Sequence, residues 1–490
     1  LIKEPLKNNK NNSLIAFSDN ASAIRGYKIR TLCPERNLFS SKFIEKDIVM
    51  NFTLKAETHN FPTAICPFPA AATGVGGRIR DNLCVGRGGL NIAGTAGYCV
   101  GNLNLDNYNL EWEDGEFKEG FILPADKILI EASNGASDYG NKIGEPIILG
   151  FARSFGQNIN QERIEWIKPI MFTGGIGFIY DEHLRKNIPK KGMKIVRIGG
   201  AAYRIGLGGS SASSNLQSIK NLSIYQDAVQ RGDAEMENKV SRVVRACVDL
   251  LGVNPIVSIH DQGAGGMANV TKEIIEPCGA DINLDNVTLG DTSLSTLETW
   301  CAEYQEQITI LVEEKNLGYI ENLCIREKVG FSCVGTITDN SRVRVRDSKN
   351  KDIKVPIDLD IDRVLGNIPQ KEFKMKTETI NLNKFDHSNI NFSTALEKVL
   401  KLLSVGSKRF LTNKVDRSVT GLIAQQQCIG PFHTPLSNFA LVAQSHMDIK
   451  GVASSIGEQP IKGLLNPAIM ARMVVGECLT NLMWVKITQF

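Results

Sequence analysis

The residues from Asp233 to Ile275, DAEMENKVSRVVRACVDLLGVNPIVSIHDQGAGGMANVTKEII, decide the fold class of this chain. Apolar residues recur at steps of three and four from Met236 to Leu251, which predicts a helix capped by Asp233 and ended by Gly252. The Asn-Pro pair that follows turns the chain into the apolar run IVSIH, a predicted strand. A Gly-rich loop and a second helical stretch, MANVTKEII, come next. This order of helix, strand, loop and helix predicts an α/β fold.

The same alternation of predicted strands, turns and helices continues on both sides of this stretch. Before it, the β-prone runs KILIEA and EPIILGFA are separated by turn signals such as SNGASDYGNK, which predicts a mixed α/β domain. A break at NIPKKGMK leads into a strand candidate, IVRIGG. After it, the β-prone ITILVE, the helix-like GYIENLCIREKV and the β-prone SCVGTIT alternate, as expected of a layered α/β sandwich.

Composition breaks divide the chain into units. We predict a first domain over 1–190, a second over 191–365, a linker over 366–394 and the start of a third domain over 395–490. The third unit ends in a helix that Asn466 caps and Pro467 opens. Because the sequence begins at Leu1 without Met and stops within the apolar stretch LMWVKITQF, we expect it to be an internal part of a longer protein.

Composition narrows the class of function. With 490 residues, 42% of them apolar and 22% charged, the chain is globular, and its net charge of +3 does not favour a nucleic-acid or membrane-surface partner. No apolar run of about 18 residues occurs, so a transmembrane helix is not expected, and the stretch LIKEPLKNNKNNS lacks the apolar core of a signal peptide. The 11 cysteines include no CxxC pair, which disfavours a disulfide framework and a thiolate zinc site. A reducing, cytoplasmic location is expected.

Segments with the pattern Gly-x-Gly-Gly start, among other positions, at Gly74, Gly206 and Gly263. Glycines at this density let backbone N–H groups converge on an oxyanion such as phosphate. None of the three completes G-x-G-x-x-G, and no Gly-Lys dipeptide is present for a Walker loop. The alternative for each is a tight turn without a ligand.

The first of these segments follows a candidate catalytic stretch, KAETHNFP. Glu57 and His59 alternate along a predicted strand, so a carboxylate and an imidazole project from one face. Mg²⁺ prefers oxygen ligands, which Glu57, Asp81 and a bound nucleotide would supply together, and His59 has the intrinsic pKa of an acid or base near neutrality. The alternatives are a structural histidine and ordinary salt bridges.

Two other places offer oxygen ligands. Asp261 ends a predicted strand beside the third Gly segment, where α/β folds collect ligands, although a helix cap is an equally good interpretation. In the last helix Glu477 and Asn481 lie four residues apart and face the same way. They are able to bind one cation together, or simply to bond to each other. The sequence contains no GxSxG elbow and no local signature of a catalytic cysteine.

Seven motifs together resemble one family closely. They are KAETHNFPTAICPFPAAATGVGGRIRD, AYRIGLGGSSASS, AVQRGDAEME, IHDQGAGG, CAEYQEQ, NKVDRSVTGLIAQQQCIGP and GECLTN, in that order. They resemble the formylglycinamide ribonucleotide amidotransferases, also called phosphoribosylformylglycinamidine synthases, in their long animal-type form. The resemblance implies alternating N-type and C-type α/β domains like those of aminoimidazole ribonucleotide synthetase relatives.

The resemblance also implies a function. Members of the family are ligases of purine biosynthesis in which ATP phosphorylates the amide oxygen of formylglycinamide ribonucleotide and ammonia then displaces phosphate. His59 would be the catalytic acid or base. Substrate-binding residues implied by the resemblance are Thr58, Asn60, Arg80, Gln230, Glu303, Tyr304 and Gln305. Magnesium ligands implied by it are Glu57, Asp81, Asp261, Asp416, Glu477 and Asn481.

Long members of the family hold a second, structural nucleotide. The nucleotide-binding residues implied by the resemblance, including an expected loop over 70–81, are Ala70, Ala71, Ala72, Thr73, Gly74, Val75, Gly76, Gly77, Arg78, Ile79, Arg80, Asp81, Leu149, Gly150, Phe151 and Val415. Ammonia would come from a glutaminase domain that this chain lacks, so the chain alone is expected to be inactive on glutamine. The alternatives are a catalytically incomplete nucleotide-binding protein or pseudoenzyme, and a different enzyme of the same superfamily.

Overall fold

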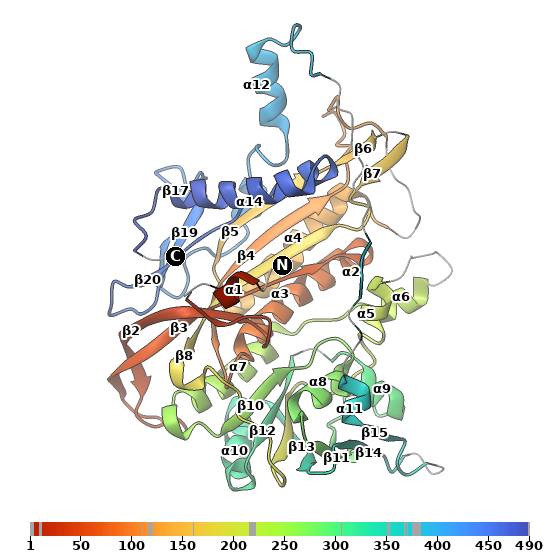
Figure 1. Ribbon diagram of the computed structural model, residues 1–490, viewed down its shortest axis with the longest axis vertical. Helices are drawn as coiled ribbons and strands as arrows, with labels where there is room; N and C mark the ends of the chain where they lie inside the picture. The colour runs from red at the N-terminus through yellow and green to blue at the C-terminus, as the bar shows by residue number, and fades with distance from the viewer. Residues whose placement is uncertain are drawn as a thin grey trace.

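Two large β-sheets and the helices packed on them account for most of the molecule (Figure 1). The computed structural model describes residues 4–8, 12–108, 110–115, 120, 122–159, 161–214, 222–304, 306–349, 353–366, 369, 371–374 and 384–488. Helices alternate with mostly antiparallel strands along the chain, which confirms the α/β class expected from the sequence.

The first sheet is built from the N-terminal third of the chain. Its strands, in spatial order, are β1 (Ser13–Ile15), β2 (Ser22–Pro34), β3 (Phe43–His59), β8 (Ile170–Tyr180), β4 (Leu90–Val100) and β5 (Ile147–Ser154). Among the pairs of this sheet only β4 and β5 are parallel. Helix α3 (Pro67–Leu83) packs on β3 and β8, and α4 (Ala125–Ile143) packs on α3. The shorter elements of this region are α1 (Glu4–Asn8), α2 (Phe61–Ile65) and the hairpin β6 (Gly156–Ile159) and β7 (Glu162–Glu165).

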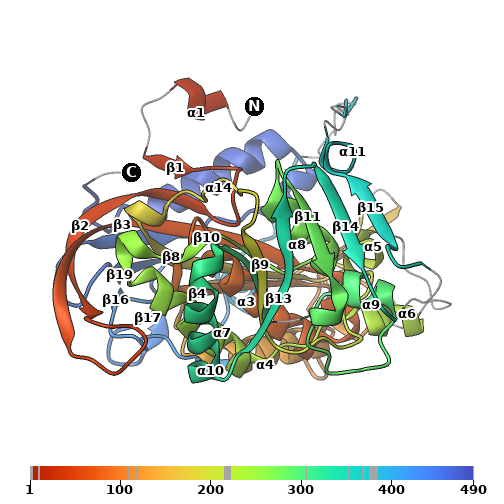
Figure 2. The ribbon, with the colours of Figure 1, turned by 90° about the horizontal axis from the view of Figure 1, so that it is seen from below.

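The second sheet follows in the chain and has helices on both faces. Its strands, in spatial order, are β10 (Ile256–Asp261), β12 (Gln307–Val312), β9 (Lys194–Gly199), β13 (Gly330–Thr338), β11 (Gly279–Asn283), β14 (Arg342–Arg346) and β15 (Ile357–Asp360). Figure 2 shows α7 (Ala234–Val248) and α10 (Leu317–Glu327) on one side and α9 (Thr296–Cys301) on the other. Helix α8 (Gly266–Ile275) shares the apolar core of the α9 side. Three short helices complete the region: α5 (Gly209–Ser214), α6 (Leu222–Ala228) and α11 (Ile361–Leu365).

Helix α7 joins the two sheets. Its buried residues Val240, Val243 and Val244 belong to one apolar cluster with Phe52 and Phe178 of the first sheet and with strand residues of the second. Asp233 caps the helix by accepting a hydrogen bond from the backbone N–H of Met236, as predicted. The helix ends at Val248, three residues before the predicted end, because Leu251–Val253 form a separate 3₁₀ turn.

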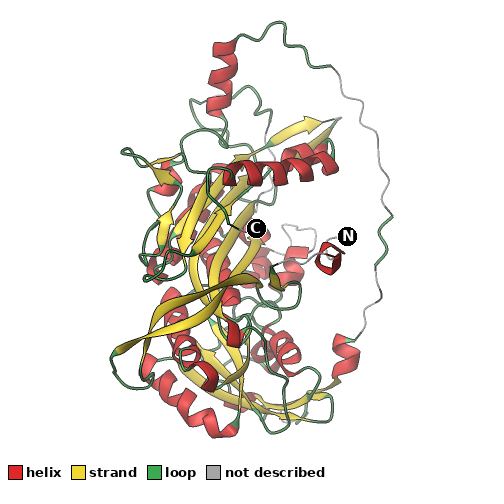
Figure 3. Ribbon diagram, turned by 60° about the vertical axis from the view of Figure 1, so that its left-hand side comes forward, coloured by secondary structure: helices red, strands yellow, loops and turns green. Residues whose placement is uncertain are grey.

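A smaller C-terminal unit packs against the first sheet. It contains α12 (Phe392–Lys401), α13 (Arg409–Thr412), the three-stranded sheet β16 (Ile423–Gln425), β19 (Phe439–Ala443) and β20 (Gly451–Ser455), the pair β17 (Cys428–Ile429) and β18 (Thr434–Pro435), and α14 (Pro467–Leu482). Leu422 and Val442 share a core with Met50 and Ile148. Asn466 caps α14, and Pro467 opens it, as predicted. Figure 3 shows that the described parts of the chain between α11 and α12 run along the outside of the molecule.

One predicted strand is wrong. KILIEA and the supposed turn SNGASDYGNK both lie within α4. Ile128, Leu129, Ala132, Ala136 and Tyr139 form a buried stripe at helical spacing, and this periodicity outweighs the β-branched residues of the run. The other strands and helices quoted from the sequence lie where they were predicted.

The observed elements fit the expected domain ranges, but the division into domains stays a prediction. The two large sheets end before 190 and 365, and the small sheet lies within 395–490. Across the described residues, we find no helix with both the length and the apolar character needed to cross a membrane.

Candidate functional site

A cavity of about 570 Å³ lies where the end of β3, α3, the end of β10 and the segments around 209, 230 and 303 meet. It gathers side chains that are far apart in the sequence. The predicted site residues that line it are Glu57, Thr58, His59, Asn60, Thr73, Gly77, Arg80, Asp81, Gln230, Asp261 and Glu303. The three predicted ligands from different elements therefore share one cavity.

Two aspartates lie at the centre of this cavity. Asn20 Nδ2 donates hydrogen bonds to Asp81 Oδ1 at 3.0 Å and to Asp261 Oδ1 at 2.6 Å, so one amide group bridges both carboxylates. Lys55 Nζ lies 3.1 Å from Asp81 Oδ2 and 3.0 Å from Glu57 Oε1. Charge compensation within the carboxylate cluster thus comes from the chain itself.

The crowding of negative charge changes the protonation of these groups. Burial, with the nearby charges of Asp261 and Glu57, raises the pKa of Asp81 to about 7. Burial also disfavours the charged form of Lys55, but Asp81 and Glu57 outweigh this effect and the pKa of its ammonium group is raised. Because the pKa of Asp81 lies near 7, a cation in the cavity would compete with both a proton and Lys55 for this carboxylate at neutral pH.

Asp261 has a second partner. Its Oδ1 lies 3.2 Å from His260 Nδ1, and His260 Nε2 lies 2.8 Å from Glu273 Oε2 in α8. Although burial opposes it, these two carboxylates raise the pKa of His260 to about 10, so the imidazole is charged at neutral pH. The alternative interpretation of Asp261 as a helix cap is wrong, because α8 begins after Gly265 without a side-chain cap.

His59 ends β3 and faces α3. Burial, aided by the charge of Arg80, lowers the pKa of its imidazole despite the nearby Glu57, so His59 is neutral near pH 7. Among the described residues its buried Nδ1 has no hydrogen-bond partner. A Cβ atom on Gly74 would lie 3.4 Å from His59 Cγ and 3.3 Å from Met171 Sδ. The glycine therefore lets α3 approach the imidazole closely.

The first Gly-x-Gly-Gly segment is not a phosphate-binding loop, which corrects the prediction for 70–81. Ala70 to Asp81 lie inside α3, where the backbone N–H groups are used by the helix itself. Only Thr73, Gly77, Arg80 and Asp81 of this stretch reach the first cavity. The side chains that are instead buried in the packing of α3 are Ala70, Ala71, Ala72, Val75 and Ile79.

Arg78 has a structural partner. Its guanidinium forms a two-point ion pair with Glu145, with Nη2 2.6 Å from Oε2, and Arg78 Nε donates to Thr173 Oγ1 at 3.2 Å. Both charged side chains are almost fully buried. This pair ties α3 to the segment before β5, and Arg78 lines neither of the two cavities described here.

The other two Gly segments do form turns. Gly206 and Gly208 have φ of +69° and +73°, and Gly265 has φ of +80°, values that favour glycine. Gly209, Gly263 and Ala264 line the first cavity. The N–H of Gly265 donates to Glu303 Oε1 at 3.1 Å, so this backbone group already has an anionic partner.

Glu303 contacts Gln230, another residue that the sequence predicts to bind substrate. Gln230 Nε2 donates a hydrogen bond to Glu303 Oε2, and both residues line the cavity. Tyr304 does not reach it: the ring is buried in the second core, and its hydroxyl donates to the backbone of Glu298 at 2.8 Å. Gln305 lies outside the described residues.

A second cavity of about 630 Å³ separates the first sheet from the C-terminal unit. The predicted residues that line it are Leu149, Gly150, Phe151, Val415, Glu477 and Asn481. Glu477 Oε2 accepts from the N–H of Glu458 at 3.0 Å, and Asn481 Nδ2 donates to the Ile456 carbonyl at 3.1 Å. Glu477 and Asn481 face the cavity and bond to these backbone groups. The alternative of a hydrogen bond between the two side chains is not what the structure has.

Asp416 stands apart from these two residues. It is absent from the cavity lining, although its neighbour Val415 is present. Its backbone N–H donates to Asn141 Oδ1 at 3.0 Å, and its carbonyl accepts from Ile147 N at 2.8 Å. The structure therefore brings Glu477 and Asn481 together without Asp416, and none of Ala70 to Asp81 lines this cavity either.

Sequence reasoning found Arg80 but missed Lys55, which pairs with carboxylates of the first cavity, and the basic residues of the second cavity. Lys55 lies two residues before Glu57, and the alternation of a strand was the signal that could have found it. In the second cavity Arg153 pairs with Glu458, and Lys408 lies beside it. Burial, with the nearby Arg153, lowers the pKa of Lys408 to about 8. These cations have the charge that a nucleotide phosphate requires.

The carboxylate oxygens of the two cavities would bind a hard cation such as Mg²⁺ only if further ligands were supplied. The described part of the chain holds no group of three or more His, Cys, Asp or Glu side chains placed to bind a metal ion by themselves. Carboxylate oxygens are nevertheless available at Asp81 and Asp261 in the first cavity and at Glu477 in the second. Because Mg²⁺ is commonly bound by one or two carboxylates plus phosphate oxygens, the residues fit magnesium brought with a nucleotide.

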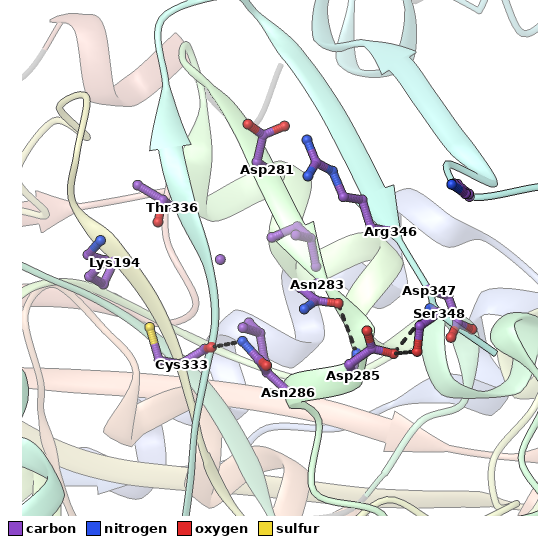
Figure 4. A pocket seen from close by; sticks show the side chains of 14 residues that line it. Lys194, Asp281, Asn283, Asp285, Asn286, Cys333, Thr336, Arg346, Asp347 and Ser348 are labelled. Atoms are coloured by element: carbon purple, nitrogen blue, oxygen red, sulfur yellow. Dashed lines mark hydrogen bonds between the residues drawn. The ribbon is translucent and has the colours of Figure 1, made fainter. Parts of the chain in front are cut away.

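A third cavity, of about 720 Å³, lies on the second sheet away from every predicted site residue. Figure 4 shows its polar side chains, among them Asp281 and Arg346. Several bond to neighbours: Asn286 Nδ2 donates to the Cys333 carbonyl at 2.9 Å, and Ser348 Oγ donates to Asp285 Oδ1 at 2.8 Å. This cavity has mixed charge and no convergent catalytic groups.

Two family models match the chain. One, described as "AIR synthase related protein, C-terminal domain", matches residues 190–348. The other, described as "FGAR-AT PurM_N-like domain", matches residues 407–490. The first covers every strand of the second sheet except β15, and the second covers the C-terminal unit from α13 onward.

Curated relatives match along almost the whole chain. The chain is 50% identical to the phosphoribosylformylglycinamidine synthase of Dictyostelium discoideum, over 100% of the chain and 37% of that protein. It is 47% identical to the human protein of the same name, over 97% of the chain and 37% of the relative. The chain therefore spans little more than a third of the length of these relatives.

Solved structures share the fold. Thermotoga maritima PurL complexed with FGAR superposes with a TM-score of 0.64 at 20% identity, over 89% of this chain and 61% of that one. The same protein complexed with ATP gives a TM-score of 0.61 at 19% identity, over 88% and 60% of the two chains. The identity is low, but the arrangement of sheets and helices is the same.

Proposed function

Since this chain belongs to the phosphoribosylformylglycinamidine synthase family over its whole length, we propose that it is the part of an ATP-dependent ligase that binds formylglycinamide ribonucleotide and ATP. The product would be formylglycinamidine ribonucleotide. The observation that carries the proposal is the first cavity, which brings together the imidazoles of His59 and His260, the guanidinium of Arg80 and the carboxylates of Glu57, Asp81, Asp261 and Glu303.

The proposed reaction has two steps. The amide oxygen of the substrate attacks the γ-phosphorus of ATP, and ADP leaves. Ammonia then attacks the amide carbon, phosphate departs with the oxygen, and one proton is removed to leave the amidine. Phosphoryl transfer depends on positioned phosphates and compensated charge more than on covalent help. This suits a cavity lined by Arg80 and carboxylates, two of which pair with Lys55.

Each residue has a proposed role. Glu57, Asp81 and Asp261 would hold Mg²⁺, which neutralises phosphate charge when it is bound with the nucleotide. His59 would accept the proton that ammonia loses, because its lowered pKa keeps the imidazole neutral and able to take a proton. Polar contacts to the substrate would come from Thr58, Asn60, Arg80, Gln230 and Glu303.

The second cavity would hold a structural nucleotide. Its walls offer the apolar residues Leu149 and Phe151 for a base, the cations Arg153 and Lys408 for phosphates, and Glu477 with Asn481 for magnesium. The bound nucleotide would join the first sheet to the C-terminal unit. Asp416 would take part only after its segment moves toward the cavity.

Partners and location follow from the same proposal. Ammonia would come from glutamine in a glutaminase domain outside this chain, and no nucleic acid or membrane would be involved. We expect this chain alone to hydrolyse no glutamine. A cytoplasmic site of action is proposed from the cysteine usage of the sequence.

Calorimetric titration of the chain with formylglycinamide ribonucleotide tests the proposal. Saturable binding that is weaker in Arg80→Ala is expected, together with amidine formation by the longest natural protein that contains this chain. The alternative, a catalytically incomplete nucleotide-binding protein or pseudoenzyme, predicts nucleotide binding without substrate binding or turnover. Absence of substrate binding at millimolar concentration would contradict the proposal.

A further inference from the structure

Behind one wall of the first cavity lies a buried cluster of charged groups. Arg80 Nη1 is 3.0 Å from Glu237 Oε2 and 3.3 Å from Glu306 Oε1. Tyr139 donates its hydroxyl toward the same two carboxylates, at 2.9 Å from Glu306 Oε1 and in close contact with Glu237 Oε2. We refer to Tyr139, Glu237 and Glu306 as the Arg80 clamp.

The clamp is more deeply buried than a surface salt bridge. Arg80 is 3% exposed, Glu237 1%, Glu306 2% and Tyr139 2%. None of the three clamp residues lines the cavity, whereas Arg80 does. Burying two carboxylates is costly unless their partners are fixed in good geometry, so this cluster is tightly constrained.

The guanidinium of Arg80 reaches from the clamp to the cavity. Its Nη1 faces the two carboxylates, while its Nη2 lies on the side of Gly77, where a Cβ atom would be 3.7 Å away. Gly77 itself lines the cavity. One edge of the planar group is therefore fixed from behind, and this sets the direction in which the other edge points.

The clamp also spans the two large sheets. Arg80 and Tyr139 come from α3 and α4, which pack with the first sheet, while Glu237 lies in α7 and Glu306 directly precedes β12 of the second. Two short segments each supply one cavity residue and one clamp residue. Gln230 and Glu303 face the cavity, and Glu237 and Glu306 follow them in the chain behind Arg80.

From this arrangement we propose that Tyr139, Glu237 and Glu306 are positioning residues that hold the Arg80 guanidinium in the orientation that binds substrate. The inference rests on the proposed function, because it takes the substrate to be formylglycinamide ribonucleotide. The clamp touches no reacting atom. Its effect passes through Arg80, and it makes the substrate site depend on correct docking of the two sheets.

A double-mutant cycle on substrate affinity tests the proposal. Glu237→Ala and Glu306→Ala are each expected to weaken the binding of formylglycinamide ribonucleotide about tenfold or more in calorimetry, since each leaves the buried guanidinium misdirected. In the background of Arg80→Ala, the same substitutions should change the affinity less than about twofold. Additive losses in the cycle would overturn the positioning role.

Controls separate positioning from general damage to the fold. Glu235→Ala removes an exposed glutamate of the same helix, which pairs with Lys239, and should leave the affinity unchanged. ADP affinity at the second cavity should stay within about twofold in every variant. If Glu237→Ala does not fold, Tyr139→Phe removes only one oxygen atom and should still weaken substrate binding about threefold. Unchanged affinity in Tyr139→Phe and in the variants that fold would sink the proposal.

A measurement without ligand distinguishes this inference from the proposed function. Rotation about the Nε–Cζ bond of Arg80, followed by NMR with labelled arginine, should be slow in the wild-type chain and at least about tenfold faster in Tyr139→Phe. If the wild-type chain binds no formylglycinamide ribonucleotide, the proposed function fails while this result still decides the clamp. Equally fast rotation in both proteins would refute the clamp alone.

Discussion

Gly76 of α3 lies directly against Tyr139 of α4: a Cβ atom at Gly76 would come within 2.7 Å of Tyr139 Oη and 2.9 Å of Glu237 Oε2. A Cβ atom on the next residue, Gly77, would have Arg80 Nη2 as its nearest contact, at 3.7 Å. We expect Gly76→Ala to lower the free energy of unfolding by about 1–3 kcal/mol, because overpacking displaces buried groups. Gly77→Ala should raise it by up to about 1 kcal/mol, because alanine favours the helix. Urea denaturation of both variants checks this, and equal stability would contradict it.

Arg78 and Glu145 form a buried ion pair between α3 and the segment before β5. Arg78→Met is expected to destabilise the chain by about 3–5 kcal/mol, because it leaves a buried carboxylate without its partner. Lys142→Ala removes one partner of an exposed pair with Asp138 and should cost no more than about 0.5 kcal/mol. Thermal and urea unfolding of the two variants supply the comparison. A similar loss in both would mean that burial does not govern these pairs.

His59→Ala should reduce ammonia-dependent phosphate release at least about 100-fold in the longest natural protein that contains this chain. Its ATP affinity should change less than about twofold, because the imidazole handles a proton and does not hold the nucleotide. His387→Ala, at an exposed position outside both cavities, serves as the control and should have wild-type turnover. Turnover near the wild-type rate in His59→Ala would remove the residue from the mechanism.

Substitutions of Glu477 and Asp416 are expected to differ in their effect on nucleotide binding in the second cavity. Glu477→Gln should weaken the binding of magnesium ADP about tenfold, since it removes a charged oxygen ligand from the wall. Asp416→Asn should have little effect, because that carboxylate is not part of the wall. Equilibrium dialysis with radiolabelled ADP, with and without magnesium, measures both. An equal loss in the two variants would place Asp416 on the metal and require its segment to move.

The protonation of Glu237 is expected to make the free energy of unfolding depend on pH. Burial, together with repulsion from Glu306 and against the attraction of Arg80, raises the pKa of Glu237 to about 8 from a usual value near 4.5. Between these pH values the folded chain holds a proton on Glu237 that the unfolded chain has released. The contribution of Glu237 to the free energy of unfolding is therefore fully present below about pH 4.5 and is lost as the pH rises to about 8. The charged and titratable groups that act on Glu237 are Arg80 and Arg78 of α3, Tyr139 of α4 and Glu306 before β12.

A comparison with Glu237→Gln isolates this effect. Relative to that variant, the wild-type free energy of unfolding should fall between pH 5 and pH 8, because glutamine cannot ionise. Urea denaturation at several pH values within this range gives the difference directly. Parallel curves for the two proteins would show that Glu237 is ionised throughout.

The carboxylate and imidazole positions of the first cavity followed from strand alternation and chain order. Glu57 and His59 do project from β3, and Asp261 does end β10 beside them. These features are local, so a sequence pattern contains them. Lys55 obeys the same alternation, and its place between Glu57 and Asp81 was predictable from charge.

The glycines were harder to interpret, since a tight turn and a close helix contact call for the same residue. Gly206 and Gly208 have positive φ, whereas Gly74 and Gly76 are helical and face His59 and Tyr139. Whether a glycine serves a tight turn or a close helix contact depends on partners that lie more than 60 residues away or in a neighbouring strand. The Arg80 clamp was out of reach for the same reason, because Tyr139, Glu237 and Glu306 share no local motif.

The ammonium group of Lys55 has a consequence for the order of events in the first cavity. While no ligand is bound, it serves as a tethered counter-ion that keeps Glu57 and Asp81 from repelling each other. Under the proposed function, an incoming divalent cation would compete with this ammonium group for the same two carboxylates. Metal binding would then release Lys55 to pair with the phosphates that accompany the metal.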